Sequence, residues 1–309
     1  MLKNPEAEPT IKISSGPYSA EVSLMGAALT KVKYRDALLV TDLDDQGELL
    51  PYAGAIIAPW VNRIADGRYR FCGVEQQLPI NEPHRHNSVH GHSAGTLWTR
   101  ISQTKRRLRL GCLLNPSQGY PHHVRIDARY RVSHHGLCLT VRAQVLDDSP
   151  APFGLGLHPY FLINGTTSTS RLKIPATEVA LTNSDTLIPE SVVGVNGTDF
   201  DFRRGVTMPL DAIDHSLGGL RKNLRSGWRT PISATLGLPN GAEVVMAWSK
   251  NLRWVHVFSN GPESSWVAIE PQTSPPNSFN SGLDQVVLLP GKTEIWRIKI
   301  HGKDSTSLP

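Results

Sequence analysis

The chain has 309 residues, of which 39% are hydrophobic and 19% are charged, with a formal net charge of +5. These proportions allow a substantial hydrophobic core, and no stretch approaches the roughly 18 consecutive apolar residues that a membrane-spanning helix needs. The basic residues are scattered and do not alternate with aromatic residues, which disfavours a nucleic-acid groove. We therefore expect a soluble globular protein that binds neither nucleic acid nor a membrane.

Period-two alternation of apolar and polar residues is the dominant pattern along the chain. It runs through four segments, residues 108–114, 126–132, 137–145 and 296–300. One apolar and one polar face per strand is what a half-solvated antiparallel sheet requires. The 26 glycines and 23 prolines supply turn signals between such segments. The pattern predicts an all-β protein, a large antiparallel β-sandwich.

Helical signals are weak by comparison. Ile213, Leu217, Leu220 and Leu224 have helical spacing, but two glycines interrupt them. No repeat and no shift in composition marks a linker. We therefore expect residues 1–309 to form a single β-sandwich domain, with an ordered core over about 9–302 and loosely held termini.

Two features bear on the compartment and on the charged surface. Cys72, Cys112 and Cys138 fit no C-x-x-C spacing and cannot all pair, and the alternation predicts that the last two are buried free thiols. The N-terminus lacks the apolar run of a signal peptide, so we expect a cytoplasmic location. The densest basic run, residues 105–109, opens an alternating segment and is interpreted as an exposed strand edge.

Histidine is the most concentrated chemical signal. His84, His86, His90 and His92 share one parity, which in an extended strand would place them on one face and suggest a metal site. However, no carboxylate follows until Asp127, and the proline and glycines of this segment indicate a loop. We therefore expect no bound metal, and a mixture of surface histidines and one or two site residues.

Three further residues combine chemistry with an unusual setting. His158 precedes a proline and follows glycines that allow close backbone approach, so it is either a core or turn histidine or a site residue. Glu270 follows an apolar run, where desolvation would raise a carboxylate pKa toward that of a general base, although a salt-bridged glutamate fits equally well. Arg63 lies in an apolar segment and needs a partner or a ligand.

The order of these residues resembles that of the aldose 1-epimerase (galactose mutarotase) family, from about Gly26 to Ile300. The segments that carry the resemblance are Asn62-Arg63-Ile64 with Gly67, Tyr69, Phe71 and Gly73, then His90-Gly91, Trp98, Gly119-Tyr120-Pro121, His158 to Phe161, Leu187 to Pro189, Gly197-Thr198, Asp201-Phe202-Arg203, Asp214-His215, Glu270 to Thr273 and Leu289-Pro290-Gly291.

The resemblance implies a galactose mutarotase-like β-sandwich with an open sugar-binding cleft and no cofactor. It implies that Glu270 is the general base for the anomeric hydroxyl and that His158 is the general acid for the ring oxygen. His90 would donate a hydrogen bond to the ring or anomeric oxygen. Asn62, Arg63 and Asp214 would hold sugar hydroxyls.

His256 lies roughly where the best-known mutarotases carry a substrate-binding glutamine, so we add it to the substrate-binding residues. The segment 152–156 is closer to a bacterial subgroup of the family, which leaves the sugar open. We expect an isomerase that interconverts the anomers of a free aldohexose such as galactose or glucose, as a monomer or homodimer. The alternatives are a sugar-phosphate 1-epimerase and a non-catalytic carbohydrate-binding protein.

Overall fold

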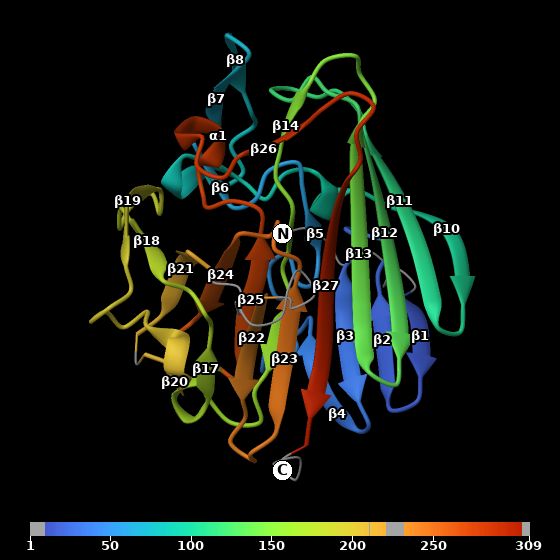
Figure 1. The fold of residues 1–309 in the computed structure, drawn as a ribbon, viewed down its shortest axis with the longest axis vertical. Coiled ribbons are helices and arrows are strands. Elements are labelled where there is room, and N and C mark those ends of the chain that lie inside the picture. Colours follow the sequence, from blue (N-terminus) through green and yellow to red (C-terminus); the bar gives the residue numbers. More distant parts are fainter. Residues whose placement is uncertain (1–9, 210, 221–231, 305–309) are drawn as a thin grey trace.

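The computed structural model describes residues 10–209, 211–220 and 232–304, and nearly all regular structure in them is β-strand. Two large antiparallel sheets dominate (Figure 1). Short helices complete the fold: α1 (Ser278–Ser281) and four 3₁₀ turns, Pro83–Arg85, Ser93–Gly95, Thr167–Thr169 and Phe202–Arg204. None of the helices in this part of the chain is long and apolar enough to span a bilayer.

The first sheet has 12 strands and provides most of the candidate site. Its strands, in spatial order, are β1 (Ile11–Ser15), β2 (Tyr18–Val22), β3 (Leu29–Tyr34), β4 (Ala37–Thr41), β16 (Tyr160–Leu162), β25 (Trp266–Gln272), β24 (Trp254–Ser259), β21 (Ile213–Gly218), β18 (Glu178–Thr182) and β19 (Pro189–Gly194). Two short strands lie beside this path, β15 (Gly156–Leu157), which pairs with β25, and β5 (Ile56–Ile57), which pairs with β15.

The second sheet has nine strands. In spatial order they are β10 (Thr99–Thr104), β11 (Arg107–Leu114), β12 (Val124–Ser133), β13 (Gly136–Val145), β27 (Glu294–Lys303), β23 (Glu243–Trp248), β22 (Ile232–Gly237), β17 (Arg171–Lys173) and β20 (Val206–Thr207). The four alternating segments of the sequence fall in β11, β12, β13 and β27, and their apolar positions are buried. The prediction of antiparallel strands with one apolar face is therefore confirmed.

One hydrophobic core joins the two sheets. Val40 and Ile269 from the first sheet and Leu110 and Tyr130 from the second belong to the same buried cluster. Each Å² of apolar surface that is buried contributes about 25 cal/mol to the free energy of folding, so this shared layer is the main source of stability. Residues 213–218 form strand β21, so their helical spacing is incidental.

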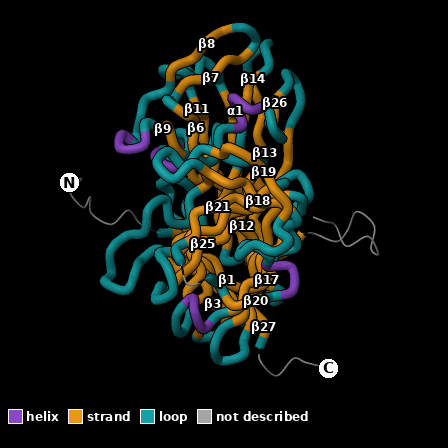
Figure 2. Tube along the Cα trace, turned by 90° about the vertical axis from the view of Figure 1, so that its left-hand side faces the viewer, coloured by secondary structure: helices purple, strands orange, loops and turns teal. Residues whose placement is uncertain are grey.

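Three small two-stranded sheets lie at one end of the molecule, toward the top of both views (Figures 1 and 2). They pair β6 (Arg63–Ala65) with β9 (Asn87–Val89), β7 (Arg68–Phe71) with β8 (Val74–Gln77), and β14 (Ala151–Phe153) with β26 (Val286–Leu288). The β6–β9 pair carries site residues from two distant parts of the sequence to the first sheet.

The remaining sequence predictions have mixed outcomes. Cys112 is buried as predicted, whereas Cys138 is half-buried and Cys72 is exposed, and all three are free thiols. Strand β27 continues to Lys303, one residue past the expected end of the ordered core, and residues 1–8 and 305–309 of the expected loose termini lie outside the described residues. Lys105 and Arg106 form the turn between β10 and β11. Arg107 and Arg109 lie on β11, which pairs with β10 and β12, so the interpretation of residues 105–109 as a strand edge is wrong for this strand.

Candidate active site

A pocket of about 180 Å³ lies on the face of the first sheet that points away from the shared core. Along β24, His256 and Phe258 line the pocket while Val255 and Val257 pack into the core, as the period of two in a strand requires. The lining residues are Pro51, Tyr52, Asn62, Arg63, Glu82, Val89, His90, His158, Tyr160, Asp214, His256, Phe258 and Glu270.

Glu270 lies on β25 and is only 1% exposed. Its Oε2 accepts a hydrogen bond of 3.0 Å from Gln272 Nε2, two residues further along the same face of the strand. Its Oε1 lies 3.3 Å from His158 Nε2. The contacts with Gln272 and His158 fix the orientation of the Glu270 side chain, which lines the pocket.

His158 is held between the short strands β15 and β16. Its backbone N–H donates to Ala55 O at 3.1 Å, and its carbonyl accepts from Gly54 N–H at 2.8 Å. The ring stacks on Tyr160, with 5.0 Å between centroids. Burial lowers the pKa of His158, while the Glu270 carboxylate acts to raise it. The charged form of this histidine therefore depends on the glutamate beside it.

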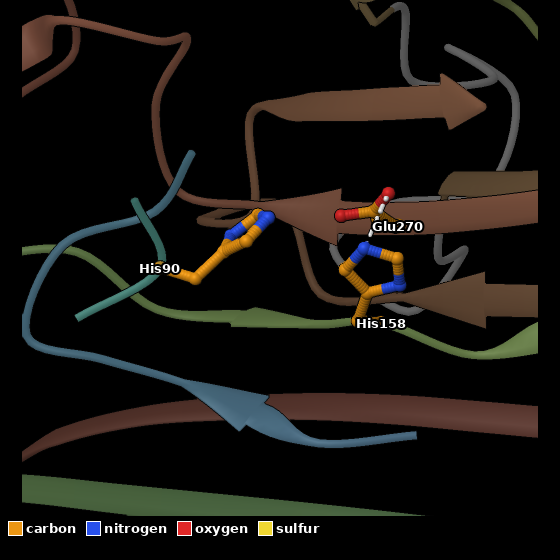
Figure 3. A group of neighbouring side chains, drawn as sticks. All are labelled: His90, His158 and Glu270. Carbon is orange, nitrogen blue, oxygen red and sulfur yellow. Dashed lines mark ion pairs between the residues drawn. The ribbon is translucent and has the colours of Figure 1, made fainter. Parts of the chain in front are cut away.

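His90 reaches toward the same carboxylate from the opposite side (Figure 3). It is locked to Asn62 by a reciprocal pair of hydrogen bonds: its N–H donates to Asn62 O at 3.0 Å, and Asn62 N–H donates to its Nδ1 at 3.3 Å. Burial lowers the pKa of His90 well below its usual value, and His158 and Arg63 act in the same direction. A neutral ring that accepts at Nδ1 must carry its proton on Nε2, so His90 is a hydrogen-bond donor toward the pocket.

The backbone at this lock is in the left-handed region, with φ of 54° at Asn62 and 62° at His90. Gly91 follows with φ of 65°, and a Cβ there would lie 2.1 Å from Ala58 O. Only glycine tolerates that close approach. The H-G pair in the sequence therefore has a local structural reason.

Next to this lock, a charged network lines the pocket, and Arg63 Nη1 joins the two by donating to Asn62 Oδ1 at 3.3 Å. Arg63 donates from Nε to Glu82 at 3.0 Å and from Nη2 to Asp214 Oδ2 at 3.2 Å. His256 Nε2 lies 2.8 Å from Asp214 Oδ1, and its Nδ1 lies 2.8 Å from Ser216 Oγ. Burial opposes ionisation of Asp214, but the bonds from His256 and Arg63 outweigh it and hold the pKa of Asp214 far below its usual value.

All seven residues proposed from the sequence line this one pocket: Asn62, Arg63, His90, His158, Asp214, His256 and Glu270. The structure brings them together; their chemical roles stay predictions. Sequence reasoning missed Glu82, Tyr52 and Gln272. A signal existed for Gln272, because a residue two positions from Glu270 shares its face of a strand. Glu82 and Tyr52 come from loops and gave no such signal.

The four neighbouring histidines separate in the structure, as expected for a loop. His84 and His86 are exposed, and His92 contacts Ser117 Oγ at 3.1 Å, so only His90 enters the pocket. The candidate metal-ligating atoms of His90, His158 and Glu270 lie within 4.8 Å of one another. A histidine that ligates a metal usually donates its other ring N–H, whereas His90 Nδ1 accepts one. The hydrogen bonding of His90 therefore does not suit a metal ligand.

Comparison with known proteins identifies the family of this chain. The model of the aldose 1-epimerase family matches residues 9–301. The chain is 31% identical over 297 residues to the uncharacterized protein YihR of Escherichia coli (strain K12), covering 95% of this chain and 93% of that protein. It is 29% identical over 231 residues to galactose mutarotase of Homo sapiens, covering 69% and 65% of the two chains.

Solved structures agree in fold. A galactose mutarotase-like protein from Clostridium acetobutylicum superposes with a TM-score of 0.83 at 19% identity, over 96% of this chain and 95% of that one. A putative aldose 1-epimerase from Escherichia coli K12 gives 0.81 at 19% identity, over 96% and 99%. The fold is the two-sheet, galactose mutarotase-like β-sandwich. The chain belongs to the aldose 1-epimerase family.

Proposed function

We propose that this protein interconverts the α and β anomers of a free aldohexose such as galactose or glucose. The observation that carries the proposal is the buried Glu270–His158 pair, with Oε1 and Nε2 3.3 Å apart on the pocket floor. An acid and a base held side by side out of bulk water are what proton transfer to and from one sugar ring requires.

In the proposed reaction, Glu270 accepts the proton of the anomeric hydroxyl while the imidazolium of His158 donates a proton to the ring oxygen. The bond between C1 and the ring oxygen breaks, and the sugar opens to the aldehyde. Rotation about the C1–C2 bond presents the other face of the carbonyl. The ring then closes with the two residues in reversed roles, so that both return to their starting protonation states.

The other lining residues orient the sugar in this proposal. The Nε2–H of His90 donates to the ring or anomeric oxygen. Asn62, Arg63, Asp214 and His256 bind sugar hydroxyls. No cofactor enters any step, because every proton that moves has a donor and an acceptor among the side chains and the sugar.

The charges of the pocket favour a neutral sugar over a sugar phosphate. Among the lining residues there are three carboxylates, Glu82, Asp214 and Glu270, and one guanidinium, Arg63. Arg63 already donates to two of these carboxylates. A phosphate dianion needs cations with free hydrogen-bond donors, whereas Arg63 already donates from all three guanidinium nitrogens to Glu82, Asn62 and Asp214.

Polarimetry tests the proposal. Fresh α-galactose or α-glucose should approach its equilibrium rotation faster with the protein than in buffer alone, in proportion to protein concentration. Glucose 6-phosphate, followed in parallel, should be accelerated less. A rate equal to that of buffer for every aldose would overturn the proposal, and a preference for the phosphate would replace it with a sugar-phosphate 1-epimerase.

A further inference from the structure

The outer face of the second sheet carries a dense array of arginines that the proposed reaction does not use. The basic run of the sequence enters it as Arg107 and Arg109 on β11, and β12 adds Arg129 and Arg131. The register places Arg107 directly opposite Arg131 and Arg109 directly opposite Arg129. Like charges directly opposite one another destabilise an antiparallel pair, so stability of the sheet does not account for this arrangement.

The array continues across two more strands. On β13, Cys138 follows Arg131 in the register and Thr140 follows Arg129. On β27, Lys299 follows Cys138 and Arg297 follows Thr140. The result is two parallel rows, each with three cations and one small neutral residue. One row is Arg107, Arg131, Cys138 and Lys299, and the other is Arg109, Arg129, Thr140 and Arg297. Burial raises the pKa of the Cys138 thiol, and Arg297, Lys299 and Arg131 oppose that rise, so the cations act on the middle of the array.

Few acids balance these charges. Arg109 pairs with Asp127 at 3.0 Å. Within the described part of the chain, Arg107, Arg129, Arg131 and Arg297 have no carboxylate within ion-pair distance, and all four are exposed. The guanidinium donors of these four side chains are therefore available to an external anion.

The face is hollowed where the arginines gather. A groove of about 600 Å³ is lined by these arginines together with the hydroxyls of Ser102, Thr104 and Thr140. A second groove of about 290 Å³ shares Arg107 and Arg131 with it. Neither groove is lined by an Asp, Glu, Phe, Tyr or Trp side chain. The first volume is within the roughly 300–1,000 Å³ of small-molecule sites, and the missing stacking platforms disfavour single-stranded nucleic acid.

We propose that this arginine groove, on the outer face of β10 to β13 and β27, binds a small molecule that carries two or more phosphoryl groups. Arginine matches phosphate oxygens with paired N–H donors, and directly opposite side chains have Cβ atoms about 4.5–5.5 Å apart. The two rows are two residues apart along the strands, about 7 Å. A single phosphate engages one row, whereas a chain of phosphoryl groups reaches both.

Calorimetric titration of the full-length protein with inorganic tripolyphosphate tests this inference. We expect saturable one-to-one binding that weakens with added salt, and binding of inorganic phosphate that is weaker on the order of tenfold or more. Arg107→Gln and Arg131→Gln should each weaken tripolyphosphate binding by about tenfold, the scale of one charge-assisted hydrogen bond.

Arg125→Gln is the matched control, because Arg125 is an exposed arginine of the same strand, β12, and lines neither groove. It should change the affinity less than about twofold, since screening weakens distant surface charges. Equal losses at Arg125 and Arg131 would overturn the proposal in favour of diffuse charge attraction. So would binding of phosphatidylserine vesicles or of an oligonucleotide without binding of tripolyphosphate. All three variants should keep wild-type mutarotation, which separates this inference from the proposed function.

Discussion

The guanidinium of Arg63 donates to both carboxylate oxygens of Glu82, at 3.0 and 3.2 Å from Nε. Glu82 is 15% exposed and lines the pocket, where its negative charge offsets that of the guanidinium. Burial acts to lower the pKa of Arg63, but Asp214 and Glu82 more than offset it and raise that pKa. Arg63 therefore stays charged, and its charge is shared between two acids.

Replacement of Glu82 should change the choice of sugar. In Glu82→Gln, one negative charge leaves the pocket while the size of the side chain and one acceptor oxygen are kept. The ratio of kcat/KM for glucose 6-phosphate to that for glucose should therefore rise by about tenfold, equivalent to about 1.4 kcal/mol. Polarimetry with both sugars measures the ratio. Glu75→Gln on β8, an exposed acid outside the pocket, is the control. An unchanged ratio in Glu82→Gln would show that Glu82 does not set the charge selectivity.

Loss of the acid should match loss of the base. His158→Asn should lower kcat on the order of a hundredfold, the scale for one positioned acid or base. The double variant with Glu270→Gln should be little slower than either single variant, because the two residues act as a unit. Initial rates corrected for the spontaneous reaction measure all three. Multiplicative losses in the double variant would mean that the residues act independently.

The sequence predicted the fold well where strands are amphipathic. Segments such as 126–132 alternate because β12 has one face in the shared core and one in solvent. Strand β25 gave a weaker signal, since all seven of its residues, Trp266–Gln272, are buried and the pattern of alternation disappears. The prediction of one domain over 1–309 stays a prediction.

The sequence predicted which residues form the site, but it did not predict the hydrogen bonds between them. His90 and His158 were identified by residue type and by order along the chain. The bond between Asp214 and His256 depends on how β21 and β24 pair, and the bond from Arg63 to Glu82 depends on a loop conformation. Neither the register nor the loop follows from local pattern, because tertiary packing sets both.

Burial of His90 predicts a pH dependence of stability. Its pKa is well below 6.5 in the folded state, so below pH 6.5 the unfolded chain binds more protons than the folded one, and stability falls as pH falls. One such group contributes a slope of up to about 1.4 kcal/mol per pH unit. His90→Asn keeps an acceptor for Asn62 N–H and removes the titrating group. The variant should therefore lose less free energy of unfolding between pH 6.5 and 5.5 than the wild type.

Urea unfolding at pH 7.5, 6.5 and 5.5 measures this difference, with exposed His135→Asn as the control. If His90→Asn and wild type lose the same free energy of unfolding over this range, His90 is not a buried neutral ring.

Catalysis should not depend on a metal ion. The backbone N–H of Asn62 donates to His90 Nδ1, so the ring proton lies on Nε2. A metal ion on the pocket side would need a lone pair on that nitrogen. Purified protein should keep its full rate in excess chelator and show no stoichiometric zinc by elemental analysis. Loss of activity on chelation that zinc restores would instead indicate a metal-assisted isomerase or lyase.

The most direct test of the account compares turnover with binding in Glu270→Gln. The substitution keeps the shape of the side chain and one acceptor oxygen, but the amide cannot accept the anomeric proton. Only interactions made in the transition state raise the rate, so a non-catalytic sugar-binding protein and an enzyme differ in turnover and not in affinity. Calorimetry should show aldose binding close to wild type, while polarimetry, corrected for the buffer rate with the same anomer, should show a loss on the order of a hundredfold or more. A Glu270→Gln variant as fast as wild type would contradict the assignment of Glu270 as the base.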